Sequence, residues 1–150
     1  MSMKDIYSYI APVNALVPQT ITVGGGAKNT GDVDLQGCNA VRVDIPAGAS
    51  GDTLAVGVHH VVMVQHADDN GSGSAGSYVA VAAKDVIGVT PDGSGNVIDF
   101  NAPAMASTVQ SFGYVGNKRF LKVTITPSAG TTNGMPMSVL VGKGERNISP

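Results

Sequence analysis

Residues 119–126 carry the pattern that most constrains the fold of this chain. Polar and apolar side chains alternate along much of this segment. One side of the extended chain would hold Arg119, Leu121, Val123 and Ile125. A period of two with β-branched residues towards its far end indicates a half-buried β-strand. Pro127 comes next and has no backbone N–H to donate, so we expect the strand to end there.

The rest of the chain favours short strands joined by turns. It contains 20 Gly and 8 Pro, and Glu145 is the single Glu among its 11 acidic residues. Gly, Pro and Asp favour turns, whereas Glu favours helix interiors. Further candidate strands are residues 20–23, 40–45, 53–66, 78–83, 97–100, 108–114 and 137–141. About eight strands, with a turn roughly every 8–12 residues, predict an all-β fold that is a β-sandwich or a jelly roll.

Residues 53–66 form the longest of these runs. One face of the extended chain would carry Leu54, Val56, Val58, His60, Val62 and Val64. The other face would carry Ala55, Gly57, His59, Val61, Met63 and Gln65. Both faces are fairly apolar, which predicts a strand in the centre of a sheet.

The first 18 residues differ in character from the rest of the chain. They show no clear strand pattern, and Pro12 and Pro18 limit regular structure. A length of 150 residues suggests one folded domain. We therefore expect an extended N-terminal arm over residues 1–18 and a single β-sandwich domain over residues 19–150. The side chains of the arm that suit contact with a neighbouring subunit are Ile6, Tyr7, Tyr9, Ile10, Leu16 and Val17.

Several short motifs occur one after another from about residue 33 to the C-terminus. They are Asp34-Leu35-Gln36-Gly37, Gln65-His66-Ala67-Asp68-Asp69, Ala80-Val81-Ala82-Ala83-Lys84-Asp85, Gly113-Tyr114-Val115-Gly116-Asn117-Lys118-Arg119-Phe120, Ser138-Val139-Leu140-Val141-Gly142-Lys143-Gly144 and Arg146-Asn147-Ile148-Ser149-Pro150. In this order they resemble the head decoration, or cement, proteins of tailed bacteriophages. The pair His59-His60 departs from the family pattern, and the residues before Thr30 match no part of it.

The resemblance implies a virion structural protein that binds the outer capsid surface and stabilises the DNA-filled head. The implied partners are the major capsid protein and further copies of the chain, as a homotrimer. Synthesis would take place in the host bacterial cytoplasm. The family has no catalytic residues to transfer. Two alternatives stay open: a tail, neck or head-fibre component of the virion, and a carbohydrate-binding β-sandwich, against which the absence of Trp counts.

Charge is sparse in this chain. Charged residues make up 13% of the sequence, hydrophobic residues 43%, and the net charge is −2. So little net charge leaves little repulsion between copies. One interpretation is that neighbouring subunits cover part of this excess of apolar residues. A well-filled core with Ala and Val on the surface is the other.

The basic residues gather at Lys118, Arg119 and Lys122. A nucleic-acid-binding surface would need more cations, interleaved aromatic residues and a basic pI, whereas the pI of this chain is about 5.8. We therefore expect no nucleic-acid partner. We expect these cations to meet carboxylates on a capsid protein or on a sister subunit, with a solvated strand end as the alternative.

Histidine and aspartate supply the candidate metal ligands. His59 and His60 would face opposite sides of a strand, while His60 and His66 would share a side but lie about 20 Å apart by strand rise. The segment 68–71, Asp-Asp-Asn-Gly, lacks the alternating ligands and the terminal Glu of an EF-hand, which favours a hairpin turn. We therefore predict no metal site, and packing or interface roles for the histidines.

The sequence also lacks the signatures of enzymes and of membrane proteins. The glycines at 24–26 do not have the spacing of a phosphate-binding loop, and no nucleophile motif stands between a strand and a helix. We predict no enzyme activity and no cofactor. Cys38 is the single cysteine, so no intrachain disulfide can form, and we expect it in the core. With no signal-peptide pattern and no apolar run near the ~18 residues of a membrane helix, we expect no membrane association.

Overall fold

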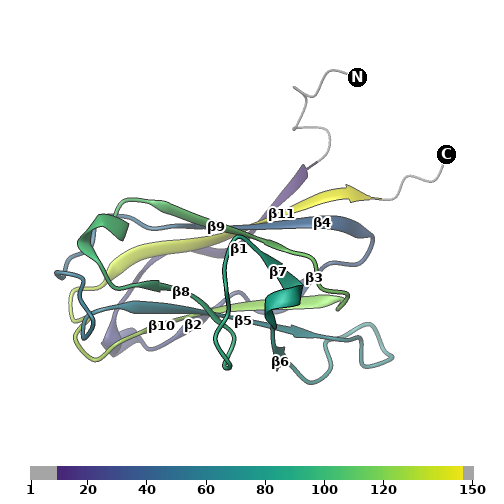
Figure 1. The fold of residues 1–150 in the computed structure, drawn as a ribbon, viewed down its shortest axis with the longest axis horizontal. Coiled ribbons are helices and arrows are strands. Elements are labelled where there is room, and N and C mark those ends of the chain that lie inside the picture. Colours follow the sequence, from purple (N-terminus) through teal and green to yellow (C-terminus); the bar gives the residue numbers. More distant parts are fainter. Residues whose placement is uncertain (1–9, 147–150) are drawn as a thin grey trace, which may run out of the picture.

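The computed structural model describes residues 10–146 and, in that range, its regular secondary structure consists of β-strands and three short 3-10 helices. The all-β sandwich predicted from the sequence is confirmed, with eleven strands rather than eight (Figure 1). The strands are β1 (Ile10–Ile21), β2 (Lys28–Asn29), β3 (Val33–Asp34), β4 (Cys38–Pro46), β5 (His60–Ala67), β6 (Val79–Ala80), β7 (Val86–Ile87), β8 (Asn96–Phe100), β9 (Val109–Tyr114), β10 (Phe120–Pro127) and β11 (Met135–Arg146). The short 3-10 helices are η1 (Val23–Gly25), η2 (Ala83–Asp85) and η3 (Pro103–Met105).

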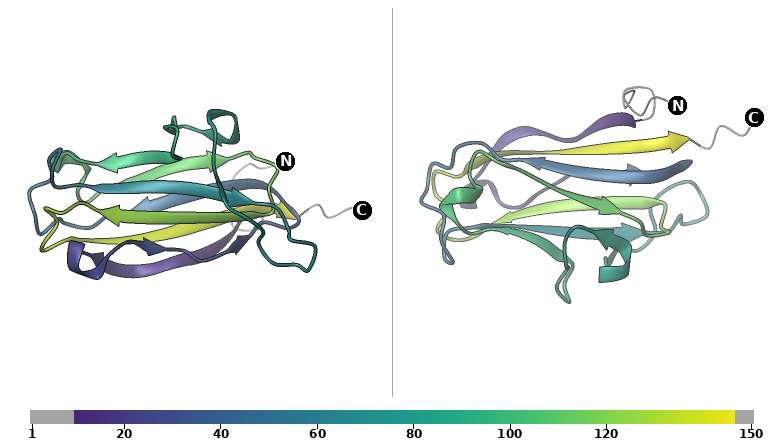
Figure 2. Two further views of the ribbon diagram at one scale, coloured as in Figure 1. Left: turned by 90° about the horizontal axis from the view of Figure 1, so that it is seen from below. Right: turned by 45° about the horizontal axis from the view of Figure 1, so that its top comes forward.

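The strands form two antiparallel sheets that lie face to face. Sheet A has the order β1-β11-β4-β9-β7. Sheet B has the order β2-β10-β5-β6, with β3 also paired to β10 and β8 also paired to β5. Figures 1 and 2 show the two layers, with β11 and β4 in one and β10 and β5 in the other. Strands that neighbour each other in a sheet are mostly distant in sequence, so the fold depends on long-range pairing.

The core lies between the two sheets and is built by alternation along the strands. Leu121, Val123 and Ile125 of β10 are fully buried, as the alternation in residues 119–126 predicts. On sheet A, Val43 and Ile45 of β4 face them from the other layer of the same cluster. Side chains of this size contribute about 1.5–3 kcal/mol each when fully buried. Their burial is therefore the main interaction that holds β10 and β4 in the two packed sheets.

The long strand expected over residues 53–66 is shorter than predicted. β5 starts at His60, and the segment before it forms a tight turn in which Ala55 and Val58 exchange two backbone hydrogen bonds of 2.9 Å. Val56, at the tip of that turn, is 85% exposed. Gly57 beside it favours a turn over a strand interior. The expected central position is correct, because β5 lies between β10 and the pair β6 and β8.

The arm expected over residues 1–18 needs correction in its second half. Residues 10–18 belong to β1, which pairs with β11 at the edge of sheet A. Leu16 is buried in the core, whereas Ile10 and Val17 are exposed. Pro12 and Pro18 are compatible with this strand because its outer edge needs no ladder donors. The other candidate contact residues of the arm, Ile6, Tyr7 and Tyr9, lie outside the described residues.

Apart from β1, the strands that sequence reasoning missed are very short. β2, β3 and β7 have two residues each, too few to show a period of two. Residues 20–23, expected to be a first strand, divide between the end of β1 and η1. β4 and β9 match the predicted segments 40–45 and 108–114 closely, because their alternation is long enough to be read.

Candidate functional site

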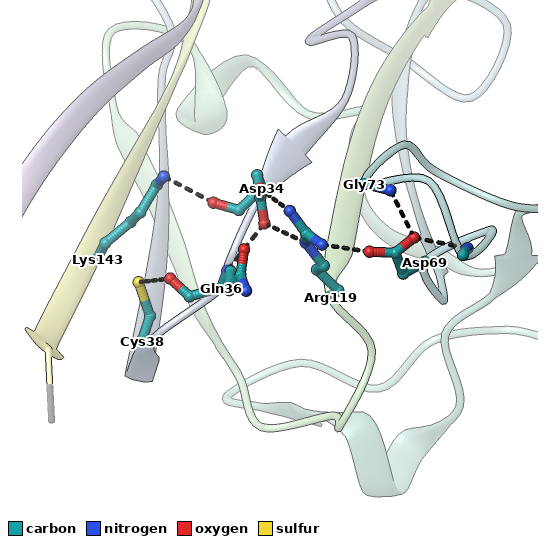
Figure 3. Close-up of polar contacts among 8 residues, drawn as sticks. Asp34, Gln36, Cys38, Asp69, Gly73, Arg119 and Lys143 are labelled. Carbon is teal, nitrogen blue, oxygen red and sulfur yellow. Dashed lines mark hydrogen bonds and ion pairs between the residues drawn. The ribbon is translucent and has the colours of Figure 1, made fainter.

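Charged side chains from four separate segments meet at one end of the sandwich. Figure 3 shows Arg119 between the carboxylates of Asp34 and Asp69, with Lys143 reaching the same place from β11. Asp34 ends β3, Asp69 lies in the loop after β5, and Arg119 immediately precedes β10. We call these residues, with Asp32, Asp68, Lys118 and Lys122, the charged cluster.

Arg119 is the centre of the charged cluster. Its Nε and Nη2 donate hydrogen bonds of 3.0 and 2.8 Å to the two carboxylate oxygens of Asp34. Its Nη1 donates to Asp69, and the guanidinium lies over the ring of Phe120 at 4.9 Å from the ring centre. The forked, planar guanidinium suits this bidentate pairing, which a lysine could not reproduce. Hydrogen bonding to Asp34 is the largest effect that raises the pKa of Arg119.

Asp34 pairs with Arg119 through its side chain and reaches sheet A through its backbone carbonyl. The hydrogen bonds from Arg119 are the largest effect on its pKa, which they lower against the opposing effect of burial. The backbone N–H of Gln36 donates to the same carboxylate at 2.9 Å. Lys143 Nζ, on sheet A, donates to the Asp34 carbonyl oxygen at 2.7 Å. The contact from Lys143 therefore ties β11 of sheet A to β3 of sheet B.

Asp69 uses its other oxygen to shape its own loop. Its Oδ1 accepts backbone hydrogen bonds of 2.7 Å from Gly71 and 2.9 Å from Gly73. These two donors are the largest cause of the lowered pKa of Asp69. The segment 68–71 is thus a turn stabilised by its own carboxylate and by Arg119. Within the described residues, no group of three or more His, Cys, Asp or Glu side chains could hold a metal ion.

The other two cations of the predicted basic cluster also pair inside the chain. Lys118 Nζ contacts Asp68. Lys122 Nζ lies 3.4 Å from Asp32 and 3.9 Å from the centre of the Tyr78 ring, and the Tyr78 hydroxyl donates to Asp32 at 2.7 Å. These cations therefore already have carboxylate partners on this chain. Sequence reasoning placed Asp34, Asp68 and Asp69 in motifs but did not pair them with the cations, because the partners are 50 to 85 residues apart.

A pocket of about 360 Å³ opens beside the charged cluster. Its walls come from the segment before and at the start of β4 and from the loop between β9 and β10, and include Leu35, Val41, Tyr114 and Lys118. Cys38 also lines it and is half-buried, so the expectation of a core cysteine is wrong. Cys38 is the first residue of β4 and lies at the end of the sandwich, beyond the buried core.

The position of the Tyr114 ring explains why the motif at residues 113–120 has glycine at position 116. Its ring is buried, and its hydroxyl lies 2.9 Å from His66 Nδ1 and accepts a 3.3 Å hydrogen bond from the backbone N–H of Lys118. A Cβ added at Gly116 would lie 2.5 Å from that hydroxyl oxygen. Position 116 therefore has to be glycine for the loop to close over the tyrosine. Burial raises the pKa of Tyr114 to about 12, so the hydroxyl stays protonated.

The three histidines occupy different environments. His59 points away from the core, and its Nδ1 lies 2.7 Å from Asp99 of β8. His60 and His66 are both buried on the inner face of β5, as the shared side of the strand predicts. His60 Nε2 lies 3.0 Å from the carbonyl oxygen of Ile21. All three therefore have protein partners inside the chain.

Comparison of the chain with protein-family models, curated proteins and solved structures gives no match. No helix in residues 10–146 is long and apolar enough to cross a membrane. The geometry of the site is that of a cross-link: ion pairs join β3, the loop after β5 and the start of β10, and a hydrogen bond from Lys143 adds β11 of the other sheet.

Proposed function

We propose that this chain is a virion structural protein that binds the outside of a tailed-phage head and stabilises the DNA-filled capsid. One observation supports this proposal above the others. Asp34, Asp69, Arg119 and Lys143 each come from a different motif of the resemblance to phage decoration proteins, and they meet in one cluster (Figure 3). Four of the six motifs thus share a physical role, which is to hold one end of the sandwich together.

An end of the sandwich held together in this way suits a protein that acts by binding. A protein that binds only the assembled shell stabilises that shell by mass action, with no chemistry required. When each copy touches more than one capsomer, individually weak contacts add up through effective concentration. The proposed partners are the major capsid protein and, in a homotrimer, two further copies of the chain.

The edge strand β1 is the proposed contact surface. Val17 is 59% exposed and Ile10 is also exposed, and β1 is an edge strand of sheet A as described over residues 10–146. Ile6, Tyr7 and Tyr9, the other proposed contact residues, precede this strand in the sequence. Lys118, Arg119 and Lys122 would take part in the contact as ion pairs, because their charges are already met within the chain.

Heads that lack this protein test the proposal directly. They should assemble but release DNA at a lower temperature than complete heads, and purified protein added back should restore the release temperature. Val17→Asp should weaken this rescue, whereas Val56→Asp, a matched change at an exposed valine outside β1, should not. Heads that are equally robust without the protein, combined with failure of tail attachment, would replace this proposal with the tail, neck or fibre alternative.

The homotrimer is tested separately by light scattering. Protein at tens of micromolar should have three times the mass of the chain. A strict monomer that nevertheless binds heads would mean that three-fold contacts form only on the shell.

A further inference from the structure

The dipeptide Asn-Gly occurs at two places in this chain, at residues 70–71 and 133–134. Asparagine is chemically labile, because the backbone nitrogen of the next residue can attack its side-chain carbonyl carbon. Glycine in the next position hinders that attack least, since it has no side chain. The sequence alone makes the two dipeptides equally reactive, but the structure places them in different surroundings.

In both dipeptides a carboxylate binds the attacking nitrogen. The backbone N–H of Gly71 donates to Asp69 Oδ1 at 2.7 Å, and the backbone N–H of Gly134 donates to Asp52 Oδ2 at 2.7 Å. The nitrogen has to lose this proton before it can attack, and the nearby negative charge disfavours the anion that is left. Each asparagine can therefore react only as fast as its glycine is released from the carboxylate.

Asp52 holds the whole of the second dipeptide. Besides the bond from Gly134, its carboxylate accepts hydrogen bonds of 2.9 Å from both the backbone N–H and the side-chain Nδ2 of Asn133. The carbonyl oxygen of Gly134 accepts a further bond of 2.8 Å from the Gly51 N–H. Gly134 is buried, and a Cβ added there would run into the carbonyl oxygen of Ile21. The nucleophile and the leaving group are thus both fixed, and the packing opposes the rotation that brings them together.

The surroundings of Asn70 favour the reaction instead. Asn70 and Gly71 are both exposed, and a Cβ added at Gly71 would meet no atom within 4 Å. Asn70 Oδ1 accepts hydrogen bonds of 2.9 and 2.7 Å from the backbone N–H and the hydroxyl of Ser72. Such donors polarise the carbonyl and stabilise the oxyanion that forms on it during attack. Within residues 10–146 the amide nitrogen of Asn70, which is the leaving group, has no hydrogen-bond partner.

We propose that Asn70–Gly71 is a site of spontaneous deamidation and that Asp52 protects Asn133–Gly134 from the same reaction. The Gly71 nitrogen loses its proton to solvent base and forms a bond to Asn70 Cγ. The bond from Cγ to the side-chain nitrogen then breaks, and that nitrogen takes up a proton and leaves as ammonia. Water opens the resulting succinimide ring at either carbonyl, which leaves aspartate or isoaspartate at position 70. The reaction does not depend on the proposed role on a phage head.

Deamidation at Asn70 alters the charged cluster. Either product adds a negative charge next to Asp68 and Asp69. Isoaspartate also lengthens the backbone between residues 70 and 71 by one carbon, which moves the Gly71 N–H away from Asp69 Oδ1. Since the other oxygen of Asp69 binds Arg119, the reaction loosens the turn that positions this ion pair.

Peptide mapping by mass spectrometry, after incubation of the folded chain in mildly alkaline buffer, tests the proposal. Asn70 should be converted at least about fivefold faster than Asn133, the ratio that one hydrogen bond of ordinary net strength supplies. Isoaspartate should be among the products, because direct hydrolysis of the amide gives aspartate alone. Equal rates at the two asparagines, faster conversion of Asn133, or aspartate as the sole product would overturn the proposal.

Variants test the protection by Asp52. Asp52→Ala removes the acceptor from Gly134, so conversion of Asn133 should rise while Asn70 keeps its rate. Asp92→Ala is the matched control, because the Asp92 carboxylate also accepts backbone N–H bonds, of 2.8 and 3.0 Å, but in a loop without an Asn-Gly dipeptide. Both asparagines should keep their rates in that variant. Conversion of Asn133 that stays as slow in Asp52→Ala as in the unaltered chain would refute the protection.

A comparison in urea needs no variant and covers the case in which Asp52→Ala does not fold. In the unfolded chain both dipeptides lose their hydrogen-bond partners, so Asn70 and Asn133 should be converted at similar rates. A preference for Asn70 that persists unchanged in urea would mean that its neighbours in the sequence set the rate, and the inference from the fold would be wrong.

Discussion

Arg119 donates two hydrogen bonds, of 3.0 and 2.8 Å, to the carboxylate of Asp34, which lies 85 residues earlier in the chain. This pair joins the start of β10 to the end of β3, and Asp69 joins the same guanidinium to the loop after β5. The basic residues Lys118, Arg119 and Lys122, which the sequence suggested as a contact for a partner, thus form cross-links within the chain. Substitutions in the charged cluster should therefore change the stability of the fold more directly than they change binding to a partner.

Arg119→Lys should lower the melting temperature by roughly 5 °C, the scale of a modest loss of stability in a domain of this size. Lysine keeps the charge but cannot reach Asp34 bidentately and Asp69 at once. Arg42→Lys is the matched control, since Arg42 makes an exposed ion pair with Asp44, its neighbour on the same strand, and should change the melting temperature little. Equal effects of the two substitutions in differential scanning calorimetry would contradict the cross-link.

Gly116→Ala should destabilise the fold by about 1–3 kcal/mol, the usual cost of inserting an atom into a packed site. The new Cβ would lie 2.5 Å from the Tyr114 hydroxyl oxygen and would force the ring or the loop to move. Gly57→Ala is the control, because a Cβ there meets nothing within 4 Å. Urea unfolding of both variants measures the difference, and two similar midpoints would refute the packing role of Gly116.

Tyr114→Phe should cost about 1–3 kcal/mol, because the buried His66 Nδ1 and the Lys118 N–H would both lose their partner. Tyr78→Phe removes a hydroxyl that donates to Asp32 at the surface and should cost less. Thermal melts followed by circular dichroism compare the two. A larger loss for Tyr78→Phe would show that the buried contact contributes less than its geometry indicates.

Asp52 should account for part of the unfolding in strong acid. Its carboxylate accepts hydrogen bonds from the backbone of Gly134 and Asn133, at 2.7 and 2.9 Å, and these lower its pKa. Its contribution is therefore present above the unfolded value of 3.8 and is lost as the pH falls through the lowered one. Asp52→Asn should be less stable at pH 7 and should lose less on going from pH 5 to pH 2. A steeper acid loss in the variant, measured by urea midpoints, would be the opposite outcome.

Truncation should distinguish the two parts of the segment first expected to be an arm. Deleting residues 1–9 should leave the stability of the sandwich unchanged but weaken head binding. Deleting residues 1–18 should cost at least about 2 kcal/mol, because it removes buried Leu16 and most of the strand paired with β11. Urea unfolding checks the stability and co-sedimentation with heads checks the binding. Equal stability of both truncations would mean that β1 adds nothing to the fold.

Sequence and tertiary structure determined different things about this protein. Alternation along residues 119–126 and 40–45 was enough to predict β10 and β4, since a period of two is a local property. The same pattern placed His60 and His66 on one face of a strand. Only the tertiary structure decided that residues 10–18 join sheet A, because an edge strand forms through pairing with its partner, here β11, which its own residues do not reveal. The pairing of Arg119 with Asp34 was likewise out of reach, because it depends on how two strands distant in sequence dock beside each other.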